Sequence, residues 1–271
     1  MPNKKNQFVD HTNSTMLHKK LSFSATEAYK LLRTNLLFAL HDDAKCQIVG
    51  VTSSMRGEGK STTAINLSYT LAEMGKRVLL IDADLRLPSV AKKLELQATP
   101  GLSNLIVGNV KPQAAVRQSE VLENWHILPA GDIPPNPTEM LGSTQMERLL
   151  KGFSETYEYI IIDLPPVNIV SDALVISPQT DGMIVVVRED YSERRALNMC
   201  TRQLTLSNVK ILGFVMNVSR EDSTSYGRYK RYKYYKYSSR YYKYSSKYYK
   251  HSGYYKSDSH TATKNNTKKG N

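Results

Sequence analysis

Residues 53–63 constrain the fold of this chain more than any other segment, because they place two glycines and a Lys-Ser pair between two apolar stretches. Residues 46–52 before them form a short, continuous apolar run, which predicts a buried strand. Residues 60–74 carry apolar side chains at helical spacing and are followed by Gly75, which predicts a helix and its end. A strand, a glycine-rich loop and a helix in this order are typical of a phosphate-binding loop.

Each residue type in this loop suits a phosphate ligand. Gly57 and Gly59 let the backbone turn tightly, so that its N–H groups can point at phosphate oxygens. The partial positive charge of a helix N-terminus also attracts an anion. Lys60 can reach the β- and γ-phosphates of ATP, and the Ser61 hydroxyl can bind Mg²⁺. The predicted nucleotide-binding residues are Ser54, Gly57, Glu58, Gly59, Lys60, Ser61, Thr62 and Asn217, the last by resemblance to related ATPases, in which this strand end lies near the adenine.

Apolar strands alternate with helices along the rest of the chain. We predict further strands at 77–82, 125–128, 159–163, 182–187 and 211–217, and further helices at 24–41, 138–153 (capped by Thr138) and 192–206. The strands are continuously apolar, which indicates that both faces of their sheet are covered. The predicted fold class is therefore α/β, a doubly wound, mostly parallel sheet of the P-loop NTPase type.

Acidic side chains follow two of these strands. Asp82 and Asp84 end one strand and Asp163 ends another. Because ligands bind at the carboxyl ends of parallel strands, we expect these carboxylates to lie beside the phosphate loop. Ser61, Asp82 and Asp163 are the predicted Mg²⁺ ligands, and Lys60, Asp82 and Asp84 the predicted catalytic residues. The alternative is that the aspartates only accept backbone hydrogen bonds from the turns that follow them.

The formal charge of +12 is concentrated at the C-terminus. Residues 220–271 carry 14 Lys and Arg against 3 acidic residues, a net charge of +11, whereas the rest of the chain is nearly neutral. This segment has almost no aliphatic residues and is predicted to be disordered. A disordered chain of this length spans roughly 40 Å, enough to reach an active site on its own or a neighbouring subunit. Single-stranded nucleic acid and anionic membrane are the alternative partners for such a basic, aromatic segment.

The segment is rich in tyrosine, with 13 of the 18 tyrosines of the chain. Tethering would present these side chains to the active site at an effective concentration near the millimolar range. They are the predicted phosphoacceptors: Tyr226, Tyr229, Tyr232, Tyr234, Tyr235, Tyr237, Tyr241, Tyr242, Tyr244, Tyr248, Tyr249, Tyr254 and Tyr255.

Together these motifs resemble those of the bacterial tyrosine kinases (BY-kinases) of capsule and exopolysaccharide synthesis, which are related to the MinD and ParA ATPases. The phosphate loop corresponds to their Walker A motif, Asp82-Ala83-Asp84-Leu85-Arg86 to their A′ motif, and residues 160–166 to their Walker B motif. Residues 27–36, residues 131–137 and the tyrosine cluster match as well. The resemblance implies an ATP- and Mg²⁺-dependent protein tyrosine autokinase that regulates polysaccharide synthesis and export.

The resemblance also implies partners. Glu27, Lys30 and Arg33 would form a contact in a homo-oligomeric ring, although Lys30 stands where the family usually has arginine. A separate membrane adaptor would activate the kinase, a cognate tyrosine phosphatase would reverse it, and nucleic acid is not an expected partner. The predicted location is the cytoplasm, at the inner face of the membrane.

A MinD/ParA-like ATPase switch is the rival function, with a basic tail that binds a partner, a membrane or nucleic acid. Such switches carry a second lysine at the start of the phosphate loop, where this chain has Met55. The thioether of Met55 cannot bind the phosphate of a neighbouring subunit.

The predicted organisation is a flexible arm at 1–21, a kinase domain at 22–219 that opens with the subunit-contact helix (22–42), and the tail at 220–271.

Overall fold

A computed structural model describes residues 21–40 and 44–218 of the 271-residue chain. The predicted arm (1–21) and tail (220–271) therefore lie almost wholly outside the described residues. The strands are β1 (Gln47–Ser53), β2 (Val78–Asp82), β3 (Arg117–Gln118), β4 (Trp125–Leu128), β5 (Tyr159–Asp163), β6 (Gly182–Arg188) and β7 (Ile211–Asn217). The helices are α2 (Phe23–Ala39), α3 (Lys60–Glu73), α4 (Val90–Lys93), α5 (Leu102–Val107), α6 (Pro112–Ala115), α7 (Pro137–Leu141), α8 (Thr144–Ser154), α9 (Asp172–Ile176), the 3₁₀ turn η2 (Ser177–Gln179) and α10 (Arg194–Leu206).

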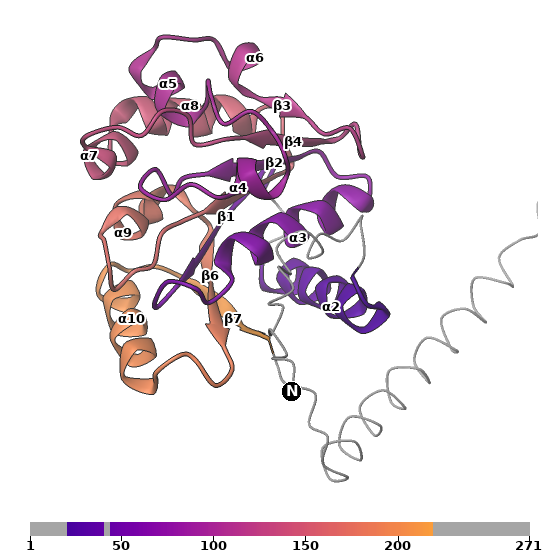
Figure 1. The fold of residues 1–271 in the computed structure, drawn as a ribbon, viewed down its shortest axis with the longest axis vertical. Helices are drawn as coiled ribbons and strands as arrows, with labels where there is room; N and C mark the ends of the chain where they lie inside the picture. The colour runs from indigo at the N-terminus through magenta and orange to yellow at the C-terminus, as the bar shows by residue number, and fades with distance from the viewer. Residues whose placement is uncertain (1–20, 41–43, 219–271) are drawn as a thin grey trace, which may run out of the picture. The chain divides into compact units, whose positions relative to one another are not determined.

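The strands form one sheet in the order β3-β4-β2-β5-β1-β6-β7. All neighbouring pairs are parallel except β3 and β4 at one edge. Helices cover both faces of the sheet, with α2 and α3 on one and α7 to α10 on the other (Figure 1). The predicted doubly wound, mostly parallel α/β fold is confirmed. The short antiparallel strand β3 was not predicted, because a two-residue strand has no periodicity to detect.

Two hydrophobic cores hold these layers together, one on each face of the sheet. The α3 side buries apolar residues of α2, α3 and the facing strands, including Leu36, Leu71 and Trp125. The other side buries residues of α5, α7, α8, α9 and α10, including Leu141, Phe153 and Cys200. Consecutive residues of a strand point to opposite cores, which explains why β2 and β5 read as unbroken apolar runs.

The prediction of a single helix at 138–153 is wrong. The structure has two helices there, α7 and α8, separated by Gly142 and Ser143. A Cβ at Gly142 would meet Val175 at 2.4 Å, so the chain packs closely against α9 at this break. Ser143, not Thr138, caps α8, because its hydroxyl accepts a hydrogen bond from Met146 N.

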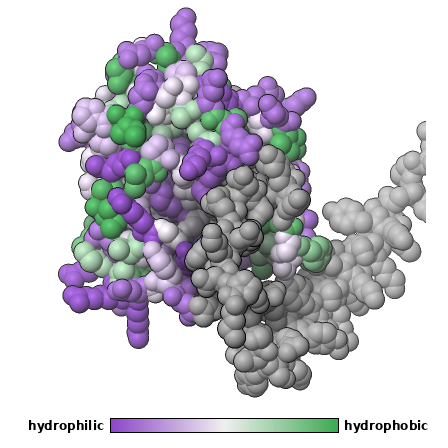
Figure 2. All heavy atoms as spheres, viewed as in Figure 1, coloured by the Kyte–Doolittle hydropathy of each residue, from purple (hydrophilic) through white to green (hydrophobic). Residues whose placement is uncertain are grey.

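The helices of the described part of the chain can be compared in length and hydropathy with helices that span a membrane. Among residues 21–40 and 44–218, no helix is both long and apolar enough to cross a membrane. On the face drawn in Figure 2, hydrophilic and hydrophobic residues are intermixed over the coloured surface. The exposed apolar side chains Phe23 and Phe38 lie on α2, and Phe214 and Met216 lie on β7.

Candidate active site

Four predicted segments meet at one edge of the sheet. The phosphate loop follows β1, Asp82 ends β2, Asp163 ends β5 and Asn217 ends β7, and these strands are parallel. Asp82 and Asp163 occupy the same register position on adjacent strands, so their carboxylates are neighbours. The convergence expected from the sequence is therefore present.

Backbone conformation at the two loop glycines explains why glycine is needed. Gly57 and Gly59 have φ angles of +79° and +98°, in the left-handed region that disfavours a side chain. A Cβ at Gly59 would lie 1.8 Å from the Nδ2 atom of Asn217. That same Nδ2 donates a 3.0 Å hydrogen bond to the carbonyl of Glu58, so the end of β7 holds the loop in place.

The side chain of Glu58 does not face the nucleotide site, as its position in the phosphate loop suggested, but makes hydrogen bonds within the loop. Its side chain is buried, with Oε1 accepting a 2.8 Å hydrogen bond from Ser54 Oγ and Oε2 accepting one of 2.8 Å from Met55 N. The predicted nucleotide-binding residues Ser54 and Glu58 therefore do not line the cavity at this site. Their side chains instead stabilise the phosphate loop through hydrogen bonds within it.

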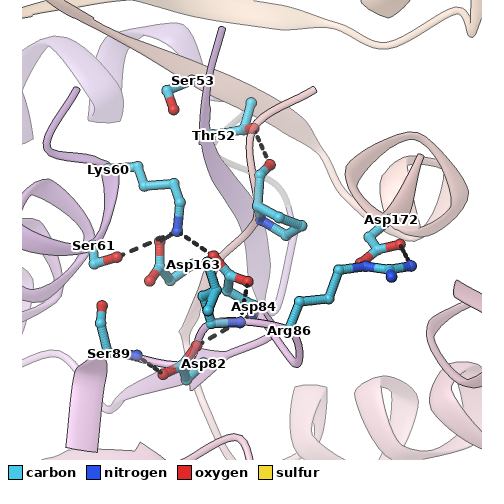
Figure 3. A network of polar contacts seen from close by, with 12 residues as sticks. Thr52, Ser53, Lys60, Ser61, Asp82, Asp84, Arg86, Ser89, Asp163 and Asp172 are labelled. Carbon is cyan, nitrogen blue, oxygen red and sulfur yellow. Dashed lines mark hydrogen bonds and ion pairs between the residues drawn. The ribbon is translucent and has the colours of Figure 1, made fainter. Parts of the chain in front are cut away.

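A cluster of one lysine and three carboxylates occupies the centre of the site (Figure 3). Lys60 Nζ lies 2.8 Å from Asp84 Oδ2 and 3.5 Å from Asp163 Oδ1. Asp82 Oδ2 accepts hydrogen bonds from the backbone N–H groups of Ser89 and Val90, at 3.0 and 2.9 Å. We call Lys60, Asp82, Asp84 and Asp163 the lysine–aspartate cluster.

Asp82 and Asp84 make the turn hydrogen bonds that the alternative interpretation expected of them. Both accept backbone hydrogen bonds from the turn that follows β2: Asp82 Oδ1 from Asp84 N, and Asp84 Oδ1 from Leu87 N. The second oxygen of Asp84 faces Lys60, and Asp84 lines the cavity whereas Asp82 does not. Of these two carboxylates, Asp84 is the one that an incoming group could reach.

Burial shifts the pKa values of the side chains in the lysine–aspartate cluster. It raises the pKa of Asp82 to about 7, and the charge of Asp163 adds to the shift. Burial also raises the pKa of Asp163, against the opposing effect of Lys60. Burial alone would lower the pKa of Lys60, but Asp163 and Asp84 outweigh it and raise that pKa. A single cation, Lys60, is thus surrounded by three acidic side chains. A second positive charge bound here would reduce the repulsion among the carboxylates.

The residues present fit a magnesium ion. Asp163 Oδ2 is fully buried and has no hydrogen-bond partner, which leaves a carboxylate oxygen available to a cation. Ser61 Oγ lies 3.4 Å from Lys60 Nζ, and its interaction with the Asp163 carboxyl lowers the pKa of that group. Within the described ranges, no three His, Cys, Asp or Glu side chains form a ready metal cage. Mg²⁺ does not need one, because it is held by one or two carboxylates and keeps several waters.

A cavity of about 490 Å³ opens beside the cluster. It is lined by the predicted residues Gly57, Gly59, Lys60, Ser61, Thr62, Asp84 and Asn217, whereas Asp82 and Asp163 lie behind this lining. Three cationic residues that were not predicted as site residues also line it, namely Arg56, Lys93 and Arg188, together with Arg86 of the A′ motif. Arg188 ends β6 at the same sheet edge, and this position was the available signal for it. Met55 does not line the cavity.

Arg86 belongs to a second charged group at this edge. Its guanidinium makes two hydrogen bonds to the buried Asp172 carboxylate, Nε to Oδ2 at 2.9 Å and one terminal nitrogen to Oδ1 at 3.1 Å. Thr138 Oγ1 accepts from Arg86 at 2.9 Å and donates to Asp172 at 2.6 Å. We call Arg86, Thr138 and Asp172 the arginine–aspartate network. It ties the turn after β2 to α7 and α9.

The predicted oligomer-contact residues lie on α2. Lys30 Nζ pairs with Glu27 Oε1 at 3.0 Å within the helix. Arg33 donates a 2.7 Å hydrogen bond to the carbonyl of Thr70 and lies 4.0 Å from Glu73, so its guanidinium joins α2 to α3. The thirteen predicted phosphoacceptor tyrosines lie outside the described residues.

Comparison with known proteins places the chain in a family. Residues 46–209 match a family model described as an AAA domain. The chain is 37% identical over 205 residues to the tyrosine-protein kinase YwqD of Bacillus subtilis, covering 75% of this chain and 86% of the relative. It is 32% identical over 204 residues to the tyrosine-protein kinase CpsD of Streptococcus agalactiae, covering 75% and 87%. The chain belongs to the bacterial tyrosine-protein kinases.

Solved structures agree with this assignment. The kinase domain of the Escherichia coli tyrosine kinase ETK aligns with a TM-score of 0.69 at 27% identity, covering 74% of this chain and 78% of that one. The chimerical protein CapA2B2 aligns with a TM-score of 0.68 at 32% identity, covering 72% and 85%. MinD of Pyrococcus horikoshii, solved with Mg-ADP, aligns less closely, with a TM-score of 0.55 at 25% identity and coverage of 66% and 72%. The predictions of a BY-kinase and of a protein-tyrosine kinase are confirmed.

Proposed function

We propose that this kinase transfers the γ-phosphoryl group of ATP to tyrosines of its own C-terminal segment, and thereby regulates capsule or exopolysaccharide synthesis and export. One observation carries the proposal: the phosphate loop, the lysine–aspartate cluster and a cation-lined cavity lie together at one sheet edge. The family, with its named tyrosine-protein kinases, supports tyrosine as the acceptor. Residues 220–271 contain thirteen tyrosines that could accept the phosphoryl group.

The loop and its cations would bind the triphosphate. Backbone N–H groups of residues 57–62 and the Lys60 ammonium would contact the β- and γ-phosphates. Arg56 and Arg188 line the cavity and would add positive charge around the nucleotide. Ser61 and Asp163 would hold Mg²⁺ directly, and Asp82 would hold it through water, since backbone donors already occupy its oxygens. When bound, Mg²⁺ neutralises part of the charge on the phosphates.

The position of Lys60 suggests how the acceptor is activated. In the structure, Lys60 Nζ forms an ion pair with Asp84 Oδ2 at 2.8 Å. A lysine drawn toward phosphate oxygens would release the Asp84 carboxylate, which faces the cavity and could take the proton of the attacking tyrosine hydroxyl. We therefore assign Asp84 the role of proton acceptor and Asp82 that of holding the turn and the metal.

The larger assembly follows the same reasoning. We take 1–21 as an arm, 22–219 as the kinase domain and 220–271 as the substrate segment. Contacts of α2 through Glu27, Lys30 and Arg33 would build a homo-oligomeric ring. A membrane adaptor would recruit the kinase from the cytoplasm to the inner face of the membrane and activate it, and a tyrosine phosphatase would reset it.

The test compares Lys60→Met with Lys45→Met, in the full-length chain with MgATP. Lys45 is exposed and pairs only with Glu155 among the contacts described for it, so its substitution controls for the loss of a lysine. Lys60→Met should abolish phosphotyrosine while keeping the circular dichroism spectrum, and Lys45→Met should label normally. Replacing the thirteen tail tyrosines by Phe should remove most of the label and keep ATP binding. Full labelling of the Lys60→Met protein would overturn the site assignment.

A further inference from the structure

The loop between β6 and α10 is bonded to the back of the phosphate loop. Arg188 at the end of β6 donates a 3.0 Å hydrogen bond to the carbonyl of Gly57. Ser192 donates to Glu58 Oε1, the carboxylate that braces the phosphate loop, and accepts a 2.8 Å hydrogen bond from Arg188 N. Residues 188–192 are therefore in direct contact with Gly57 and Glu58.

Tyr191 lies in this loop, beside the phosphate loop but outside the cavity. Its ring is covered by the Arg188 guanidinium, 4.9 Å from the ring centroid. Its hydroxyl borders Gly57, since a Cβ built on Gly57 would lie 3.1 Å from Tyr191 Oη. Tyr191 is not among the residues that line the nucleotide cavity. The hydroxyl can therefore influence the nucleotide without contacting it.

Exposure separates Tyr191 from the other tyrosines of the described residues. Tyr191 is 52% exposed, whereas Tyr157 is buried and Tyr29, Tyr69 and Tyr159 are only partly accessible. Burial raises the pKa of the Tyr29, Tyr69 and Tyr157 hydroxyls above the ordinary value. Within residues 21–40 and 44–218, Tyr191 is thus the most exposed tyrosine.

From these contacts we infer that Tyr191 is a phosphorylation site of this kinase, and that its phosphate weakens nucleotide binding. The inference rests on the proposed kinase activity. Because Tyr191 lies outside its own cavity, the donor is ATP bound to a second copy of the chain. The bond from the γ-phosphorus to Tyr191 Oη forms, and the bond from that phosphorus to the β–γ bridging oxygen breaks. ADP leaves with the electron pair, and the phenol proton passes to a carboxylate of the second copy.

The charges around Tyr191 give the expected effect its sign. A phosphotyrosine adds about −1.5 to −2 charges at neutral pH. The Arg188 guanidinium lies over the Tyr191 ring, and a phosphate on this tyrosine would compete with the carbonyl of Gly57 for it. The same negative charge would stand next to a site built for the phosphates of ATP. Both effects lower nucleotide affinity, and we expect a decrease of about fivefold or more.

The phosphorylation step has a clean readout by mass spectrometry. Trypsin cleaves after Arg188 and Arg194, and the peptide 189–194 contains Tyr191 as its single tyrosine. Full-length Lys60→Met protein, as the acceptor, is incubated with wild-type kinase and MgATP, and fragmentation separates a phosphate on Tyr191 from one on Ser192. Phosphate on Tyr191 of the Lys60→Met chain supports the inference. A phosphorylated tail with an unmodified Tyr191 overturns it and leaves the proposed function standing, whereas no phosphotyrosine anywhere overturns the proposed function itself.

The effect on the nucleotide needs a matched control, Tyr191→Phe, which keeps the ring and cannot accept phosphate. Both proteins are brought to the same tail phosphorylation, and ADP affinity is measured by calorimetry before and after. Before incubation the two should bind ADP equally. Afterwards the wild type should bind at least about fivefold more weakly than Tyr191→Phe. Equal affinities after incubation, with Tyr191 phosphorylated in the wild type, would overturn the regulatory half of the inference.

Discussion

The lysine–aspartate cluster and the arginine–aspartate network lie at the same sheet edge, yet they balance their charges differently. In the network, one carboxylate, Asp172, receives two hydrogen bonds from Arg86 and one from Thr138. In the cluster, Lys60 faces three carboxylates, and one oxygen of Asp163 has no partner. Removing one partner of a balanced pair leaves a buried charge unpaired and should destabilise the fold, whereas neutralising one carboxylate of an unbalanced group should not.

This comparison predicts that neutralising an acid of the cluster harms activity and spares stability. Asp163→Asn keeps the shape of the side chain and removes a buried charge. We expect autophosphorylation to fall by about 1000-fold or more, because the variant loses the charge that we propose holds the metal and positions the phosphates. The free energy of unfolding in urea, without nucleotide, should be unchanged or higher. A variant that unfolds more easily than the wild type would contradict the proposed imbalance.

The network should respond in the opposite way. Arg86→Met removes the cation from the fully buried Asp172 and should lower the free energy of unfolding by about 3 kcal/mol. The matched control is Arg77→Met, whose side chain is 60% exposed and lies 4.0 Å from Glu158. That change should cost less than about 1 kcal/mol. Both are measured by urea unfolding, and equal losses would mean that the network is not a special source of stability.

The raised pKa of Asp82 predicts a pH dependence of the nucleotide-free protein. In the unfolded chain Asp82 ionises near its ordinary pKa of 3.8, whereas in the folded protein it holds its proton until about pH 7. Stability from this group is therefore complete below about pH 4 and is lost as the pH rises toward 7. Between pH 5 and pH 7.5 the loss should be about 2 kcal/mol.

The comparison for this pH dependence is Asp82→Asn, which cannot titrate at this position. Its free energy of unfolding should fall less than that of the wild type over the same interval. Parallel pH profiles of the two proteins would show that Asp82 is ionised throughout, and that the cluster is better balanced than its contacts indicate.

Thr138 should give the smallest of these effects. Thr138→Val is nearly isosteric and removes the hydroxyl that joins Arg86 to Asp172. The bidentate pair remains, so we expect a loss of about 1 kcal/mol in the free energy of unfolding. A loss as large as that of Arg86→Met would mean that the hydroxyl, and not the ion pair, holds α7 and α9 to the turn after β2.

Much of the site could be predicted from the sequence because its parts are local. The phosphate loop combines glycines, Lys60 and Ser61 within a few residues, and each aspartate stands directly after an apolar strand. Parallel strands bring their carboxyl ends to one edge, so position in a strand was enough to predict that Asp82, Asp163 and Asn217 meet there. The same logic predicted the strand at 125–128 and the strand at 159–163 with the bounds they have in the structure.

The remaining features depend on contacts between segments far apart in the chain. Glu58 reads as a loop residue, and only packing shows that its carboxylate is buried against Ser54 and Ser192. Arg188 and Lys93 lie outside the motifs, and Arg56 lies in the phosphate loop without a predicted role. They line one cavity because the fold brings the end of β6, the end of α4 and the phosphate loop together. The break between α7 and α8 is set by the close approach of Gly142 to α9, which helical periodicity does not register.

The sequence by itself determined that this chain has a phosphate-binding loop, a parallel sheet and three acids at the strand ends, because those signals are short-range. Only the tertiary structure decided which charges are balanced and which are not. It paired Arg86 with Asp172 across 86 residues and left Lys60 among three carboxylates. Charge balance depends on distances of a few ångströms and on burial, and neither is encoded in the spacing of residues along the chain.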